Sequence, residues 1–264
     1  MSMHFSILAS GSTGNAIFIS TAKTRLLVDA GLTGKKLEEL LHQIGQHPKD
    51  LDAILITHEH SDHIKGLGVL ARRYKIPIYA NAQTWLELEK ACGPIDLEQK
   101  FHFERGEILT LGDVEIESFG LSHDAREPMA FCFHHEGKKL GIATDLGYVS
   151  EKIKGILKGA HVLIFEANHD VHMLLSGSYP WHIKRRILSD VGHLSNEDSG
   201  EALAEIITEA TSRVYLAHLS QDNNMRELAR MTVEQILKGA GIEVGQQVRL
   251  YDTYPDRPTP LAVL

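Results

Sequence analysis

Four potential metal ligands fall within residues 58–63, His-Glu-His-Ser-Asp-His, and this cluster constrains how the chain can fold. It directly follows an apolar run at 53–56 that is typical of a buried strand. A strand that turns into a helix here would direct His58 and His60 to one side and Asp62 and His63 into a neighbouring position. Imidazole and carboxylate groups are common ligands of divalent cations. The cluster therefore predicts two adjacent metal ions and a binuclear metallohydrolase.

Four further polar residues each stand where a predicted strand ends: Asp29, His123, Asp145 and His218. Loops at strand ends are where protein scaffolds present catalytic groups. Taken singly, a histidine or aspartate at such a place is more often structural. Together with the 58–63 cluster, these four residues indicate one shared site.

Length and composition fit a single globular domain over residues 1–264, because no linker, repeat or low-complexity tract interrupts the chain. The two cysteines, Cys92 and Cys132, cannot form a disulfide framework and favour a reducing compartment. No signal peptide or membrane-length apolar run is evident, so a soluble cytoplasmic protein without a membrane partner is expected. The net charge of -8 argues against a broadly basic surface, although a local basic groove stays compatible with it.

The apolar pattern predicts an α/β fold with many strands. Strands are predicted at 5–8, 16–19, 25–28, 53–56, 76–79, 114–119, 130–134, 140–143, 162–165, 214–217 and 248–251. Helices are predicted at 35–44, 84–90, 197–208 and 225–237, and the polar residues Ser195, Asn196 and Ser199 mark the start of the third. Two mixed sheets packed face to face, with helices on both outer faces, accommodate this order.

The ordered series of these polar residues resembles the motifs of the metallo-β-lactamase superfamily over nearly the whole chain. The resemblance implies a four-layer αββα sandwich with a binuclear site along one edge of its two mixed sheets. It also implies two ligand triads, which are His58, His60 and His123 for one metal and Asp62, His63 and His218 for the other. Asp145 would bridge the two ions, and Asp29 would orient a ligand imidazole by accepting its other N–H.

The chemistry that the resemblance implies is hydrolysis. Two divalent ions about 3.5 to 4 Å apart lower the pKa of a bridging water, so that a hydroxide exists at neutral pH. Diiron reductases of the same superfamily are expected to carry a carboxylate where this chain has His60, which argues against redox chemistry. Histidine ligands suit Zn²⁺, whereas the two carboxylates leave Mn²⁺ or Fe open. Asp62 is expected to be essential for catalysis as well as a ligand.

Two later elements resemble those of the tRNA-processing endonuclease RNase Z. They are Glu166-Ala167, after an apolar strand, and His193-Leu194-Ser195, before a helix. By that resemblance His193 would assist proton transfer at the scissile phosphate and Glu166 would orient it, the alternative being a structural or surface histidine. RNase Z itself fits poorly, because the chain has no flexible Gly/Pro-rich arm. RNase J and other β-CASP nucleases insert a large domain for which the interval between Asp145 and His218 leaves no room.

A closer resemblance is to the YycJ/WalJ (VicX) group of bacterial nucleases in this superfamily. It rests on the motifs at 10–15, 123–128, 144–147, 166–170, 179–180 and 192–196. The resemblance implies a metal-dependent phosphodiesterase that degrades DNA from 5′ to 3′, with DNA as its partner and a role in mismatch repair.

Five polar residues are candidate substrate contacts: Ser10, Ser12, Asn15, Lys184 and Arg186. The first three lie in a glycine-rich turn that could face a phosphate, or that could simply connect two strands. The two basic residues could contact a backbone phosphate or form a solvated helix face. The neighbouring Trp181 is expected in the core rather than stacked on a base.

Two other functions stay open on sequence alone. A small-molecule hydrolase on the same fold, either a cyclic phosphodiesterase related to PhnP or a thioesterase or lactonase, would use the same metals. Glu166 and His193 favour phosphodiesters but do not separate nucleic acid from small cyclic esters. A non-catalytic metal-binding module is disfavoured by the complete ligand set. A homodimer is compatible with the sequence, since symmetric dimers are the commonest assemblies.

Overall fold

The computed structural model describes residues 2–264, and its strands within that range form two seven-stranded sheets. The first sheet contains, in spatial order, β14 (Ala262–Val263), β1 (His4–Ala9), β2 (Ala16–Ser20), β3 (Arg25–Val28), β4 (Ala53–Leu55), β5 (Ile78–Ala80) and β6 (Lys100–His102). The second contains β13 (Arg249–Asp252), β12 (Arg213–Ala217), β11 (Val162–Glu166), β10 (Lys138–Ala143), β9 (Met129–His135), β8 (Val114–Gly120) and β7 (Ile108–Leu111). Both sheets mix parallel and antiparallel pairs.

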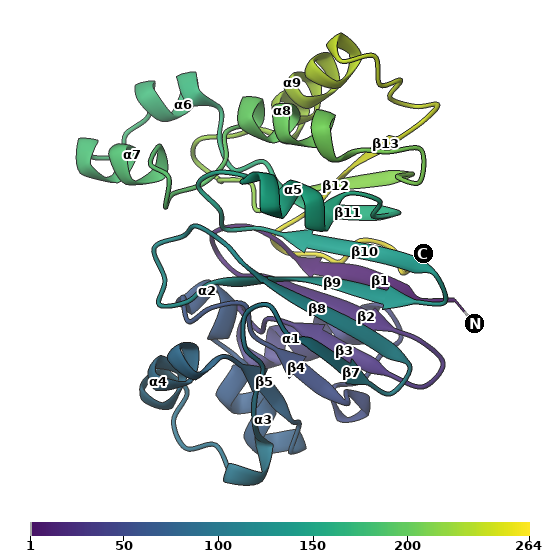
Figure 1. Ribbon diagram of the computed structural model, residues 1–264. Coiled ribbons are helices and arrows are strands. Elements are labelled where there is room, and N and C mark those ends of the chain that lie inside the picture. Colours follow the sequence, from purple (N-terminus) through teal and green to yellow (C-terminus); the bar gives the residue numbers. More distant parts are fainter. Residues whose placement is uncertain (1) are drawn as a thin grey trace.

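Helices cover the outer face of each sheet, as Figure 1 shows. The first sheet carries α1 (Gly34–Gln43), α3 (Leu67–Tyr74) and α4 (Ala82–Ala91), and the second carries α5 (Glu151–Leu157), α8 (Asn196–Ile206) and α9 (Arg226–Gly239). The short helix α2 (Ser61–Ile64) follows β4, while α6 (Val171–Ser176) and α7 (Trp181–Ile187) project together from the second half of the molecule (Figure 1). The predicted four-layer αββα architecture is confirmed.

The core lies in three apolar layers. One fills the space between the sheets and includes Phe5, Phe131 and Ile164, and the other two lie between each sheet and its helices. Central strands such as β2 and β11 are buried along their whole length, which explains why they appear in the sequence as unbroken apolar runs. This packing fixes the ends of the strands, from which the polar loops described below emerge.

Some elements differ from the prediction. The edge strands β6, β7 and β14 were not predicted, because they are short and partly exposed and so lack a strong apolar pattern. The strand predicted at 76–79 begins two residues later, at Ile78. The helix expected where the 53–56 strand turns is present as α2, but four others were not among the predicted ranges, α3, α5, α6 and α7, all of them eight residues or shorter. Ser195 caps α8 as predicted, in a reciprocal pair with Asp198.

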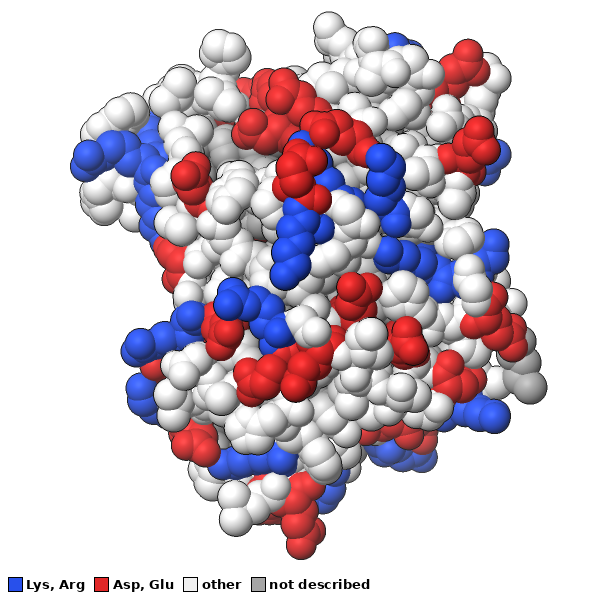
Figure 2. All heavy atoms as spheres, in the orientation of Figure 1, with Lys and Arg blue, Asp and Glu red and all other residues white. Residues whose placement is uncertain are grey.

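The surface mixes both signs of charge. On the face in Figure 2, Lys and Arg atoms lie among Asp and Glu atoms, and a basic group marks the projecting α7 region. Both cysteines are free thiols and buried. Among residues 2–264, we find no helix that has the length and apolar character needed to span a membrane.

Candidate metal centre and active site

The seven predicted ligands converge at one end of the two sheets. Those of the 58–63 segment follow β4 and enter α2, and the other three follow strands β8, β10 and β12. The donor atoms of His58, His60 and His123 lie within 4.8 Å of one another, and so do those of the second predicted triad, Asp62, His63 and His218. Asp145 lies within the same distance of His58 and His63 in one group and of His218 in another. The aspartate therefore lies between the two triads, where the sequence predicted it.

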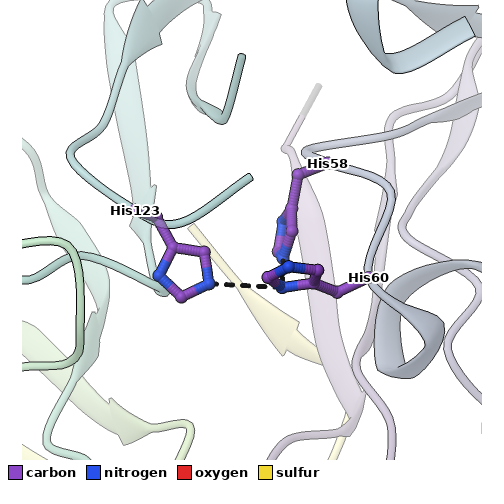
Figure 3. A group of neighbouring side chains, drawn as sticks. All are labelled: His58, His60 and His123. Carbon is purple, nitrogen blue, oxygen red and sulfur yellow. Dashed lines mark hydrogen bonds between the residues drawn. The ribbon is translucent and has the colours of Figure 1, made fainter. Parts of the chain in front are cut away.

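The first triad shows how well these side chains fit a cation. In Figure 3, the three imidazoles point toward one another, with His60 Nδ1 3.1 Å from His58 Nε2 and 3.3 Å from His123 Nε2. In the second triad, His218 Nε2 is buried without a hydrogen-bond partner among the described residues, and the buried Oδ2 of Asp145 has only His63 Nε2 near it, at 3.2 Å. Buried nitrogen and carboxylate atoms without partners are costly unless a cation binds them. The residues present therefore suit a pair of divalent metal ions.

Strained backbone presents three of the site residues. Asp29, Asp145 and His218 have φ values of 60°, 63° and 55°, and each directly follows a strand of the core or lies within two residues of its end. A left-handed residue turns the chain sharply at the strand end, so its side chain faces the site. Gly31 allows the close approach that follows Asp29, because a Cβ there would lie 1.6 Å from the backbone oxygen of Asp62. The backbone therefore fixes these side chains before any ligand binds.

Three of the ligand imidazoles, those of His58, His63 and His123, are held through Nδ1. His63 Nδ1 donates to Asp29 Oδ2 at 2.7 Å, which is the contact predicted for Asp29, and Thr57 donates its backbone N–H and its hydroxyl to the same carboxylate. His58 Nδ1 lies 3.0 Å from the Thr57 hydroxyl. His123 Nδ1 lies 3.1 Å from the backbone oxygen of Gly192. Such contacts fix the tautomer and orientation of a ligand imidazole, leaving Nε2 for a metal.

The electrostatics of the site favour ionised carboxylates. Burial alone would raise the pKa of the Asp145 carboxyl, but His218 and His63 hold it well below its usual range. Burial lowers the pKa of His58 well below its ordinary value. Burial also opposes the charged form of His218, yet Asp145 raises its pKa to about 10. The protein without metal thus pairs anionic carboxylates with protonated imidazoles, whose protons a metal ion would replace.

His193 and Glu166 form a hydrogen-bonded pair beside the ligands. His193 Nδ1 donates to Glu166 Oε1 at 2.9 Å, and the other oxygen of Glu166 accepts the backbone N–H of Leu146 and of Leu194. Glu166 is fully buried, and although burial would raise its pKa, His193 and His218 lower it to about 2. The geometry expected between Glu166 and His193 is therefore present. His193 itself remains partly exposed and lines a cavity with His60, Asp62 and Asp145.

The cavity has a volume of about 240 Å³ and separates the predicted substrate contacts into two groups. Ser12 and Arg186 line it, but Ser10, Asn15 and Lys184 do not. Ser10 is buried and its hydroxyl accepts the backbone N–H of His218, whereas the amide of Asn15 bonds to Gly11 and faces His63. These two side chains are therefore already occupied in supporting the site, and their contact with substrate stays a prediction.

Lys184 and Trp181 also differ from the prediction. The ammonium of Lys184 is buried and donates to the backbone oxygens of Leu175 and Gly177, both at 2.7 Å, so it is not free to bind a phosphate. Trp181 lies on the surface of α7 with 59% of its area exposed instead of in the core. The basic run on α7 thus serves two purposes, since Lys184 ties the segment together and Arg186 faces the cavity.

Comparisons with known proteins agree with the fold and the order of the motifs. A family model described as "Beta-lactamase superfamily domain" matches residues 24–219. The chain belongs to the beta-lactamase superfamily. It is 56% identical to exodeoxyribonuclease YycJ from Bacillus anthracis over 99% of both chains, and 53% identical to exodeoxyribonuclease WalJ from Streptococcus pneumoniae strain D39 over 97% of this chain and 96% of the relative. The predicted resemblance to the YycJ/WalJ group is thereby confirmed.

A solved structure supports the same architecture. The metallo-beta-lactamase fold protein YhfI from Bacillus subtilis superposes with a TM-score of 0.75 at 16% identity, covering 98% of this chain and 99% of that one. This likeness concerns the fold alone.

Several cavity residues of this superfamily member were not predicted as site residues. Asp124 lies next to His123 in the sequence, its Oδ1 lies 3.4 Å from His123 Nε2, and its other oxygen accepts a hydrogen bond from Arg186 Nε. Tyr179, Ile183 and Ser220 also line the cavity. Asp124 and Tyr179 were within motifs that carried the resemblance, so proximity to those motifs was the available signal. Ile183 and Ser220 offered none.

Proposed function

We propose that this chain is a binuclear metal-dependent exodeoxyribonuclease that degrades DNA from its 5′ end. The observation that carries the proposal is that His193, which Glu166 orients, and Arg186 line one cavity with members of both predicted ligand triads. A proton-transfer group and a cation beside a two-metal cluster suit a phosphodiester better than an uncharged ester. The choice of DNA is supported by the exodeoxyribonucleases that are 56% and 53% identical to it.

The residues that would hold the metals are the two triads, with Asp145 between them. His58, His60 and His123 would bind one ion and Asp62, His63 and His218 the other, while Asp29 orients His63. When bound, the ions would supply Lewis-acid polarisation of the phosphoryl group and a nucleophile at neutral pH. Zinc or manganese is the proposed metal, with iron as an alternative, because the donor set combines imidazoles with two carboxylates.

The chain's own groups would position the phosphodiester and manage its proton. Glu166 keeps Nδ1 of His193 protonated, so that Nε2 is the atom that holds or releases a proton toward the leaving oxygen. Arg186 brings a positive charge to the cavity wall, and Asp124 holds the guanidinium in place. A phosphate would attract that guanidinium from its present partner, while Ser12 offers a hydroxyl at the rim.

We also propose that the protein works in the cytoplasm on DNA ends that arise during repair. Two free buried thiols are compatible with a reducing compartment. A homodimer remains a proposal without a structural argument of its own.

The test uses purified protein with Mn²⁺, Zn²⁺ or Mg²⁺ on end-labelled DNA and RNA strands and on a small cyclic phosphodiester. We expect a 5′-labelled DNA strand to release labelled mononucleotide at once, and a 3′-labelled strand to give a ladder of shortening fragments. Asp62→Ala should abolish cleavage while leaving the thermal unfolding curve of the metal-free protein nearly unchanged, since Asp62 is partly exposed and belongs to the site and not the core.

Three outcomes would contradict the proposal. Preferred turnover of the cyclic ester would indicate a small-molecule phosphodiesterase, and preferred cleavage of RNA would indicate a ribonuclease. Binding of one metal ion or none per chain, measured by elemental analysis, would reject the binuclear site.

A further inference from the structure

Two cavities meet beside the predicted metal site. The first, of about 240 Å³, contains the ligands and His193, and the second, of about 330 Å³, lies on the other side of the loop that follows His218. Ser220 lines both cavities, and Ser10, which bonds to the backbone of His218, lines the second. An internal segment of a DNA strand that lay against the ligands could therefore extend from the first cavity into the second across Ser220.

A side-chain hydrogen bond stands at that junction. The hydroxyl of Tyr179 donates to Asp222 Oδ2 at 2.7 Å and also bonds to Ser220. Tyr179 belongs to the segment between α6 and α7 and lines the first cavity, whereas Asp222 belongs to the loop between β12 and α9. The bond thus connects two separate parts of the chain beside Ser220, the residue that lines both cavities.

Both ends of this connection are anchored. Lys184, through its bonds to Leu175 and Gly177, holds the turn that leads to Tyr179. On the other side, the buried amide of Asn224 donates to the backbone oxygens of Ala167 and Asn168, next to the site. These hydrogen bonds of Lys184 and Asn224 restrain the two segments that carry Tyr179 and Asp222. The connection therefore holds Tyr179 in place in the wall of the first cavity.

The second cavity suits phosphate groups. Arg226 lines it, and the guanidinium of Arg226 lies 5.1 Å from the centre of the Tyr254 ring, while that of Arg257 lies 3.9 Å from the same ring. One acidic residue, Glu227, also lines this cavity. Tyr254 and Arg257 lie outside the lining of this cavity, so Arg226 is the group in it that can attract a backbone phosphate. A strand that crossed Ser220 from the first cavity could therefore continue along the second, if the Tyr179–Asp222 bond did not stand in its way.

We propose that the Tyr179–Asp222 hydrogen bond is an end stop, which confines cleavage to the terminus of a strand. The inference rests on the proposed nuclease function. With the wall closed, a strand can place only its end against the ligands and must leave the first cavity on the Arg186 side. With the wall open, an internal segment can lie across both cavities, and the same ligands cleave it there. Tyr179 and Asp222 are thus specificity-determining residues that separate exonuclease from endonuclease activity.

The experiment compares a linear single-stranded DNA with a covalently closed circle of the same sequence, which has no ends. We expect the wild-type protein to degrade the linear strand and to leave the circle intact. Tyr179→Phe and Asp222→Ala each remove one partner of the bond and should raise the ratio of circle to linear cleavage by about tenfold, the scale of one lost hydrogen bond. The double variant should show no larger ratio than the single ones. Tyr179→Ala removes the whole ring and should raise the ratio most.

The matched control is Tyr74→Phe, which removes a tyrosine hydroxyl that bonds to the carboxylate of Glu38 on the helices of the first sheet. Its ratio should equal that of the wild type. Circles that stay intact with Tyr179→Phe and Asp222→Ala, while linear strands are degraded, would overturn the end stop, and so would a wild-type protein that cuts circles. Failure of the wild type to degrade linear DNA would instead reject the proposed function.

Discussion

Glu166 connects the proposed proton-transfer group with a proposed metal ligand. Its Oε1 lies 2.9 Å from Nδ1 of His193 and 2.9 Å from Nδ1 of His218, so one buried carboxylate oxygen orients both rings. Its low pKa keeps it anionic, which favours protonation of both Nδ1 atoms and leaves both Nε2 atoms facing the site. A substitution of Glu166 would therefore affect both proton transfer by His193 and metal binding by His218. A substitution of His193 would affect proton transfer alone.

His193→Ala should lower kcat on DNA by about 10²- to 10⁴-fold, the usual contribution of a general acid or base. Metal content should stay at two ions per chain, because His193 is outside both triads. The fall should be much smaller on a nitrophenyl phosphodiester, whose leaving group needs no proton. Steady-state kinetics and elemental analysis check this together, and an equal loss of metal and activity would show that His193 is structural.

At this scale the structure gathers the predicted ligands in one place, but it gives three of the five predicted substrate contacts, Ser10, Asn15 and Lys184, other partners. His58 to His63 are consecutive and the others follow apolar runs, so their positions at strand ends were visible without a structure. For Ser10 and Lys184 the type of residue suggested a phosphate contact, but their partners are backbone groups that only the folded chain brings near. A polar side chain in a motif can support the site as readily as it can touch the substrate.

Helix α7 and the segment that joins it to α6 form one side of the cavity. Both helices are short and were not predicted, because six or seven residues give too few turns for a clear apolar period. Ile183 and Arg186 on α7 nevertheless line the cavity, and Lys184 ties α7 to the turn after α6. The two hydrogen bonds of the buried Lys184 ammonium thus hold these short helices together, where longer helices would rely on apolar contacts.

Lys184→Met should loosen this pair of helices without unfolding the sheets. Loss of the ammonium leaves the backbone oxygens of Leu175 and Gly177 without their partner, at a cost of about 1 to 3 kcal/mol. We expect faster hydrogen exchange over residues 171–187 and a raised KM for DNA. Lys152→Met, on an exposed face of α5, is the control and should change neither. Unchanged exchange at 171–187 would show that Lys184 does not hold the segment.

For the whole molecule, the metal site joins the two halves of the sandwich. The 58–63 ligands emerge from the first sheet, and the other three, His123, Asp145 and His218, emerge from the second. Ions bound here would link the sheets at one end, while the apolar layer between them links the rest. The αββα order could be predicted because buried strands are apolar throughout; the way the sheet edges close, with β1 paired to β14, depends on contacts between the first and last residues.

Removal of the metals should therefore lower the thermal stability of the entire chain. Metal at about 100 times its Kd adds about 2.7 kcal/mol to the free energy of unfolding, so a chelator should lower Tm by several degrees and added metal should restore it. His63 and His218 have raised pKa values without metal, so their protons must leave on binding. Metal affinity should consequently increase with pH until about pH 10, where His218 has lost its proton without metal.

Differential scanning calorimetry measures the change in Tm, and titration calorimetry in two buffers of different ionisation enthalpy counts the protons released. A Tm that is independent of metal would show that the ions do not link the sheets.

At Asp29, Asp145 and His218, whose backbone is left-handed, selection for thermal stability opposes selection for activity. Glycine adopts this conformation without strain, and asparagine tolerates it better than most residues. A library screened for heat resistance in the absence of metal would therefore drift toward those two residues at the three positions, and would lose two ligands and the residue that orients His63. A thermal screen of this protein should therefore also select for metal binding. Otherwise it will yield variants that are thermally stable but inactive.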